Sequence, residues 1–146
     1  MDSILNYVSK DVAKCFRDNH IILASTHQYM VQYITDVQTK KTSESVEFGI
    51  YKNPIDEIIS NDLVDVYVKY YYAPLLTDAK RFFVETYHID IQVDYESETK
   101  SWQYTIINLE TNQKIYDVVC YKTYEDALNN GLIYTILHIN KLFDYA

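Results

Sequence analysis

Four histidines, two cysteines and 21 carboxylates are the residues with which this chain could do chemistry. His88 and Asp90 form one histidine–carboxylate pair. They stand two residues apart at the start of an expected strand, so their side chains would share a face and could touch. A catalytic base needs an orienting partner of this kind. The alternative is a polar helix end that leads into the solvent face of a strand, and this is the interpretation we favour.

The remaining histidines and the cysteines point to no reaction. His20 and His27 could contribute to a metal site, but neither H-x-x-x-H nor C-x-x-C spacing occurs. Cys120 has no histidine near it in sequence that would lower its thiol pKa, so we expect a buried strand cysteine. His138 is expected to be a buried histidine of the last helix. The sequence therefore predicts no enzyme, no metal and no cofactor.

The elements that would position these residues are clearest in the second half of the chain. Apolar residues alternate over 89–95 and 101–109, and a third strand is expected over 114–121, which indicates an antiparallel meander. Thr123 then caps a helix over 124–143 that is apolar nearly all round. Gly131 is expected to let this helix lie close to the sheet. The helix is therefore core and not a site.

The first half is expected to begin with a helix over 10–18, capped by Ser9 and ended by Asn19. Residues 2–8 either extend this helix backward or form a short strand. Strands are expected over 28–35, 46–51 and 64–72, with a loop over 36–45 and one helical turn within 55–61. Pro74 opens a helix over 75–87.

Length and composition limit the class of protein. At 146 residues the chain is expected to be a single α+β domain, residues 1–146, with helices packed on an antiparallel sheet in the order α-β-β-α-β-β-β-α. The net charge of −8 without a basic patch disfavours nucleic acid and anionic membranes. We find no membrane span and no signal peptide. With only two cysteines, the location predicted is the cytoplasm of a bacterial host.

Residues 72–142 contain a series of short sequence motifs. They resemble small uncharacterised proteins from phages and mobile elements of gut Bacteroidetes, in which an A-P step opens a helix and a T-Y-E-E-A-L helix follows three strands. The chain departs from the pattern at Phe83 and at Asn129-Asn130. The resemblance implies a phage-like context but no activity, and it brings no functional residue. The segments that carry it are Tyr72-Ala73-Pro74-Leu75, Arg81-Phe82-Phe83, Tyr87-His88-Ile89 and Tyr121-Lys122-Thr123-Tyr124-Glu125-Asp126-Ala127-Leu128.

The abundance of tyrosine, 16 residues, favours a protein-interaction module. Tyr70, Tyr71 and Tyr72 cannot all point inward from an extended segment, so they are the candidate partner contacts, together with Asp62 and Asp65. Self-association is left open.

Two further possibilities concern nucleic acid. The first is an acidic decoy whose carboxylates imitate phosphates; its candidates are Asp56, Glu57, Asp62, Asp65, Asp90, Asp94, Glu96 and Glu98. The second is a fold like that of a double-stranded-RNA-binding domain, suggested by the order helix, three strands, helix. The acidic start of the last helix, Tyr124-Glu125-Asp126, opposes RNA binding.

Overall fold

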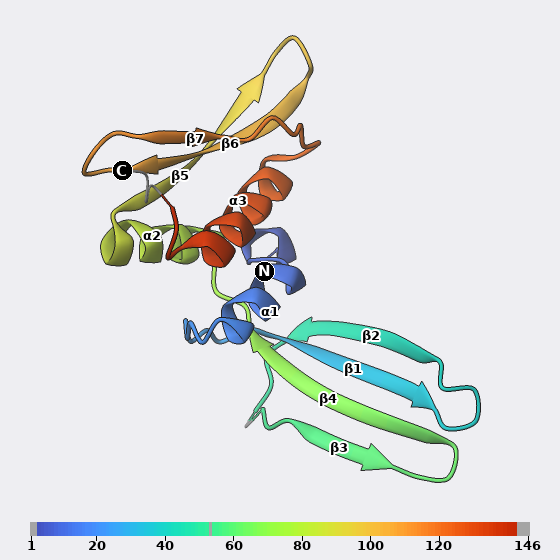
Figure 1. Ribbon diagram of the computed structural model, residues 1–146. Coiled ribbons are helices and arrows are strands. Elements are labelled where there is room, and N and C mark those ends of the chain that lie inside the picture. The colour runs from blue at the N-terminus through green and yellow to red at the C-terminus, as the bar shows by residue number, and fades with distance from the viewer. Residues whose placement is uncertain (1–2, 53, 143–146) are drawn as a thin grey trace.

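Two antiparallel sheets lie on opposite sides of a layer of helices (Figure 1). The computed structural model describes residues 3–52 and 54–142. The α+β class is confirmed, and the order of elements roughly matches the expected one: the strand expected over 64–72 is β4, and β3 is an additional strand before it. The elements are η1 (Ile4–Asn6), α1 (Lys10–Asp18), β1 (Gln28–Asp36), β2 (Thr42–Gly49), β3 (Glu57–Ser60), β4 (Val64–Tyr72), α2 (Leu76–Tyr87), β5 (Ile89–Glu96), β6 (Ser101–Asn108), β7 (Lys114–Tyr116) and α3 (Tyr124–His138).

The four-stranded sheet has the order β2-β1-β4-β3 and projects away from the helices (Figure 1). Gln28, the first residue of β1, faces Tyr72, the last residue of β4, so the chain enters and leaves this sheet side by side. Because β2 and β3 are opposite edges, the connection between them, described over 50–52 and 54–56, crosses one face of the sheet. Tyr51 marks the crossing: its N–H donates to Gln28 Oε1 (3.1 Å), and its ring centroid lies 5.4 Å from that of Tyr70.

The three-stranded sheet β5-β6-β7 carries α3 and α2 on its apolar face. Thr123 caps α3 as expected, since its Oγ1 accepts a hydrogen bond from the N–H of Asp126 (3.0 Å). A Cβ on Gly131 would lie 2.7 Å from Ile91 Cγ2, which confirms that the glycine permits close approach of helix and sheet. At Gly131, α3 therefore lies in direct contact with Ile91 of β5 and Tyr104 of β6.

Helix α1 joins the two sheets. Ser9 caps it through the N–H of Val12 (3.3 Å), as the sequence predicts. The N–H of Ser9 donates in turn to Asn129 Oδ1 on α3 (2.8 Å). On the other side, the buried Tyr29 hydroxyl donates to the carbonyl oxygen of Val8 (2.7 Å). Side chains from both sheets and all three helices belong to one apolar cluster.

Several local expectations are corrected. The predicted helical turn within 55–61 is instead β3, because this segment pairs with the free edge of β4. The predicted loop 36–45 is shorter, since β2 already begins at Thr42. Residues 4–6 form a short 3₁₀ helix, so neither alternative for 2–8 holds there; residue 2 lies outside the described residues. Helix α3 ends at His138, and residue 143 lies outside the described residues.

The third strand of the meander is also shorter than expected. It ends at Tyr116, the chain bulges outward over 117–120, and Tyr121 rejoins β6 through two 2.8 Å backbone hydrogen bonds with Trp102. The expectation of a buried Cys120 is therefore wrong, because the bulge carries it to the surface. His138 is likewise exposed, since it lies on the outer side of α3, where its Nδ1 is 2.9 Å from the carbonyl oxygen of Tyr134.

Candidate functional site

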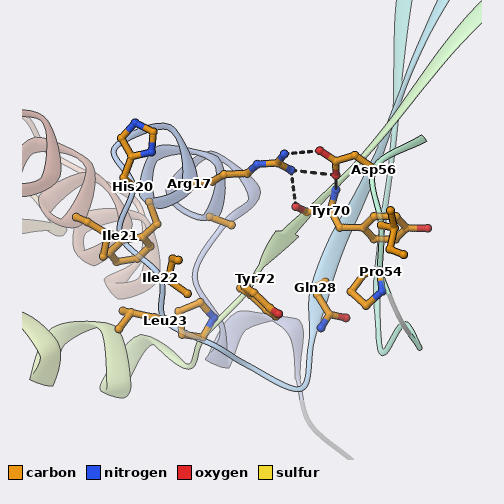
Figure 2. Close-up of a pocket in the computed structure, with 14 residues that line it drawn as sticks. Arg17, His20, Ile21, Ile22, Leu23, Gln28, Pro54, Asp56, Tyr70 and Tyr72 are labelled. Atoms are coloured by element: carbon orange, nitrogen blue, oxygen red, sulfur yellow. Dashed lines mark hydrogen bonds and ion pairs between the residues drawn. The ribbon is translucent and has the colours of Figure 1, made fainter. Parts of the chain in front are cut away.

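A cavity of about 680 Å³ lies where α1 meets the base of the four-stranded sheet. Four separate stretches line it: residues 13–23, Gln28, residues 54–56 and residues 70–74. Figure 2 shows the side chains of these stretches arranged around one space. The volume falls within the range of about 300–1,000 Å³ that ligand pockets usually have. This cavity is our candidate site.

An ion pair closes one side of the cavity. Arg17 Nη2 contacts Asp56 Oδ2, and Arg17 Nη1 donates to the carbonyl oxygen of Tyr70 (2.8 Å). Asp56 Oδ1 also accepts the N–H of Tyr70 (3.2 Å). The two side chains thereby occupy the edge of β4 beyond the end of β3, in place of a paired strand (Figure 2). They fix residues 54–56 to α1.

The hydrogen bond from Arg17 holds the pKa of Asp56 below its ordinary value. A carboxyl group with a lowered pKa stabilises the fold above its ordinary pKa, and this contribution is lost as the pH falls through the lowered value. The pair is partly exposed, so its contribution to stability is small. Its main role is to position the wall of the cavity.

The opposite wall is a short extended segment that follows α1. The helix ends at Asn19, and His20 takes the left-handed conformation (φ 59°), which turns the chain sharply. The N–H of Ile21 then donates to the carbonyl oxygen of Phe16 (2.9 Å). From there Ile21, Ile22 and Leu23 run along the cavity as an apolar wall.

Gln28 and Arg17, two polar side chains of the cavity, are already engaged by other groups of the protein. Gln28 is 5 % exposed, and its Nε2 donates to the carbonyl oxygen of Ser25 (3.3 Å) while its Oε1 accepts the N–H of Tyr51. Arg17 is held by Asp56 and Tyr70. Figure 2 shows His20 on the far side of Arg17 from Asp56, so histidine and carboxylate do not converge. The surface offered to a ligand is thus mainly apolar.

Beyond the cavity, the outer part of the same face of the four-stranded sheet is covered by no described helix, although Val68 on this face is buried. The strand register places six side chains together on its outer part, all of them half-buried or exposed. Among the described residues, no helix makes extensive contact with this part of the sheet. We call it the open face; it consists of Met30, Gln32, Ile34, Ile59, Val64 and Val66.

The predicted partner contacts are divided by the fold. Tyr70 and Tyr72 line the cavity, and Tyr72 is 44 % exposed, which confirms that the tyrosine run does not all point inward. Tyr71 lies on the other face of β4, 2 % exposed, under the guanidinium of Arg17. Asp62 and Asp65 lie at the far end of β4, roughly 23 Å away for a strand of this length. The structure does not bring them together with the tyrosines.

The histidines are spread out. The side chain of Asp90 pairs with Lys80 (3.5 Å), whereas His88 Nε2 lies 3.6 Å from Glu110. Glu85 and His88 have E-x-x-H spacing, but His88 follows the end of α2 in a left-handed conformation. His27 packs between aromatic rings. Within 3–52 and 54–142, no three His, Cys, Asp or Glu side chains gather as metal ligands would.

The carboxylates proposed as a phosphate mimic do not form one continuous row. Asp90, Asp94 and Glu96 lie on the outer face of β5, but Asp90 pairs with Lys80 and Gln92 interrupts the row. Glu98 lies in the turn after β5, and the acidic residues from 56 to 65 are divided between both ends and both faces of the other sheet.

Comparisons with protein-family models, with curated proteins and with solved structures found no match to this chain. In the part of the chain that the structure describes, no helix is long and apolar enough to cross a membrane.

Reasoning from the sequence missed most of the cavity. Arg17, Gln28 and Asp56 come from separate elements, and no local spacing links them. One signal was available: Ile21, Ile22 and Leu23 form an apolar run that belongs to no periodic element. Apolar residues without a period require either a covering element or a ligand.

Proposed function

We propose that this protein is a non-catalytic protein-interaction module, and that the four-stranded sheet is its contact surface. The proposal keeps the phage or mobile-element context that the sequence pattern implies, with action in the cytoplasm of a bacterial host. Its partner is another protein.

The observation that carries the proposal is the projecting sheet itself. The inner part of the other face is buried beside α1, around Tyr29, Val31 and Tyr71, whereas the open face is mainly apolar and is covered by no described helix. Apolar residues are exposed on the other face as well, among them Ile58 and Tyr67. Extended, exposed apolar surface on a protein usually marks a place where another molecule binds.

The total accessible surface supports the same proposal. It is 9565 Å², whereas a compact monomer of 17.3 kDa exposes about 7,800 Å². The excess is roughly 1,800 Å², about twice the area that one partner contributes to a standard protein–protein interface. This excess accessible surface is large enough to form an interface with a partner.

The acidic decoy is supported less well, because its carboxylates are spread over separate surfaces and two of them are ion-paired, Asp56 with Arg17 and Asp90 with Lys80. A fold like that of RNA-binding domains remains a description of the order of α2, β5, β6, β7 and α3. It contributes no binding surface to the proposal.

The test is affinity capture from host lysate at low and high salt, with the tagged chain and two variants. Ile59→Arg places a charge on the open face, where Ile59 is 52 % exposed. Val118→Arg places the same charge on the 117–120 bulge, where Val118 is 89 % exposed. Both positions are exposed, so we expect both variants to fold.

We expect a specific partner that persists at high salt, is lost with Ile59→Arg and is kept with Val118→Arg. An apolar interface resists salt, whereas contacts between exposed charges are screened. Capture that vanishes at high salt would favour the decoy. Capture that both variants retain, or turnover of a nucleotide by the purified chain, would contradict the proposal.

A further inference from the structure

We infer that the outer edge of β2 pairs, antiparallel, with the same edge of a second copy of this chain, so that two four-stranded sheets join into one. The two-fold axis of the pair passes through Ser45. The inference goes beyond the proposed function and does not depend on it, because it uses the edge of the sheet and leaves the open face accessible to a partner.

The outer edge of β2 carries backbone groups that no described strand pairs with. β2 is the outermost strand of the four-stranded sheet (Figure 1). In the hairpin, the N–H of Asp36 donates to the carbonyl oxygen of Lys41 (2.9 Å), which fixes the alternation of hydrogen bonds along β2. Every second residue therefore directs its N–H and its carbonyl oxygen away from β1. These outward-directed residues are Thr42, Glu44, Val46 and Phe48.

The other sheet edges suit a second copy less well. β3 and β7 are short, with four and three residues. β5 has eight residues, but its outer face carries Asp90 and Asp94, and a pairing centred on Gln92 would place these two carboxylates opposite each other. β2 also has eight residues, and none of them is a proline or a lysine, the residues that commonly protect an edge strand.

The geometry of the backbone selects the register. In a symmetric pair only outward-directed residues bond to each other, so near the middle of β2 the axis can pass through Glu44, Ser45 or Val46. Centring on Glu44 places two carboxylates opposite each other, and centring on Val46 leaves Thr42 without a partner inside the strand. Centring on Ser45 places Glu44 opposite Val46. It also places Thr42 opposite Phe48, so every outward-directed residue of β2 is paired.

This register also brings opposite charges together. Glu47 of one copy lies opposite Ser43 of the other copy and has Lys41 as a diagonal neighbour on the same face. Diagonal neighbours across antiparallel strands are within reach of long side chains. Within residues 3–52 and 54–142, neither Glu47 nor Lys41 has an ion pair, and Glu47 lies beside Tyr51, whose hydroxyl is neutral. Symmetry forms the contact between Glu47 and Lys41 twice.

The remaining carboxylate of β2 adds little repulsion. Glu44 Oε1 is held by Lys10 Nζ of its own chain (2.9 Å), which balances its charge. Each chain has a net charge of −8, but the antiparallel arrangement places the helices of the two copies at opposite ends of the joined sheet. The two open faces then lie on the same side, because residues opposite each other in a sheet point to one face.

The test is sedimentation of the full chain at low salt over a range of concentrations. We expect a reversible dimer. Val46→Pro removes an outward-directed N–H and no hydrogen bond to β1, so it should weaken the dimer at least tenfold. Ile58→Pro is the matched control. The N–H of Asn61 donates to the carbonyl oxygen of Val64 (3.0 Å), so Ile58 is directed away from β4 at the opposite edge, and its replacement should leave the dimer unchanged.

An exchange of charges tests the register. Glu47→Lys and Lys41→Glu each place like charges on the diagonal, and each should weaken the dimer about tenfold at low salt. The double variant restores opposite charges and should recover the affinity of the parent chain. Both side chains are exposed, so we expect all three variants to fold.

A chain that stays monomeric at every concentration, or a Val46→Pro dimer as tight as that of the parent chain, would overturn the pairing at this edge. A double variant as weak as the single ones would overturn the register centred on Ser45. A dimer lost with Ile59→Arg and kept with Val46→Pro would assign the contact to the open face instead. The proposed function is tested separately, by capture of a partner with Ile59→Arg and Val118→Arg, and its failure leaves the dimer standing.

Discussion

Gly131 sets how closely α3 lies on β5. Alanine has the higher helix propensity, by about 1 kcal/mol. Here, however, its Cβ would meet Ile91 Cγ2 at 2.7 Å and the ring of Tyr104 at 3.1 Å. Overpacking of this kind costs about 1–3 kcal/mol, so we expect Gly131→Ala to lower the free energy of unfolding in urea.

Gly49→Ala is the matched control for this substitution. The nearest atoms to a Cβ on Gly49 are those of Tyr51 at 3.8 Å, an ordinary contact. It should leave stability nearly unchanged. A Gly131→Ala protein as stable as the parent would show that α3 does not need this close approach.

Tyr29 gives a second prediction at the scale of one residue. Burial raises its pKa to about 12, and its hydroxyl donates to the carbonyl oxygen of Val8 (2.7 Å). The contribution of the neutral Tyr29 side chain to the free energy of unfolding is therefore complete below pH 10, and it is lost as the pH rises through 12. Tyr29→Phe should cost about 1–3 kcal/mol at neutral pH, because a buried carbonyl loses its donor.

Urea unfolding at neutral pH and above pH 10 measures this loss. The stability difference between parent and Tyr29→Phe should shrink as the pH rises, since the parent tyrosine then favours the unfolded state in which it can ionise. A difference that stays constant with pH would contradict a buried, neutral Tyr29.

Between elements, one amide side chain connects α3 to the start of α1. Asn129 Oδ1 accepts the N–H of Ser9 (2.8 Å), while its Nδ2 donates to the carbonyl oxygen of Glu125 (2.8 Å). Asn129→Ala removes the acceptor for the N–H of Ser9, so we expect thermal unfolding to shift downward by an amount equivalent to about 1–3 kcal/mol.

Asn130→Ala tests whether this effect is specific. Asn130 makes the same type of contact to the preceding turn (2.8 Å) but is exposed and connects no other element. Its replacement should change stability by less than about 0.5 kcal/mol. Equal losses in the two variants would mean that helix propensity, and not the link to α1, is responsible.

The elements themselves were largely predictable from sequence where local chemistry determines them. Ser9 and Thr123 cap their helices as predicted, because the capping contact lies within one turn. β3 could not be predicted in this way, since its four residues are exposed and owe their conformation to the edge of β4. The bulge at Cys120 has the same explanation: the strand-like composition of 117–120 was outweighed by pairing further along at Tyr121.

The cavity is a property of the whole molecule and was not predictable from sequence. Its walls come from α1, from the segment that crosses the sheet and from β4, which are brought together only by the tertiary fold. The tyrosine run was a usable signal for Tyr72 but not for Tyr71, because alternation along a strand directs neighbours to opposite faces.

Across the whole molecule, we expect the four-stranded sheet to have a lower local stability than the part formed by β5, β6 and α3. The strands of the projecting sheet have exposed outer parts, whereas β5, β6 and α3 share the packed core. Amides in β2 and β3 should therefore exchange with solvent faster than those of α3. Hydrogen exchange followed by mass spectrometry measures this. Equal protection of amides from exchange in the two regions would contradict the prediction that the four-stranded sheet is locally less stable than the packed core.

The facing pair Gln28 and Tyr72 has a consequence for how this architecture can vary. Since the chain departs from the helices and returns to them at one point, matched residues can be added or removed at the distal turns without moving α1 or α2. Each residue added to or removed from every strand changes the length of the four-stranded sheet by about 3.4 Å. Four-stranded sheets of different lengths can therefore be attached to the same helices and three-stranded sheet.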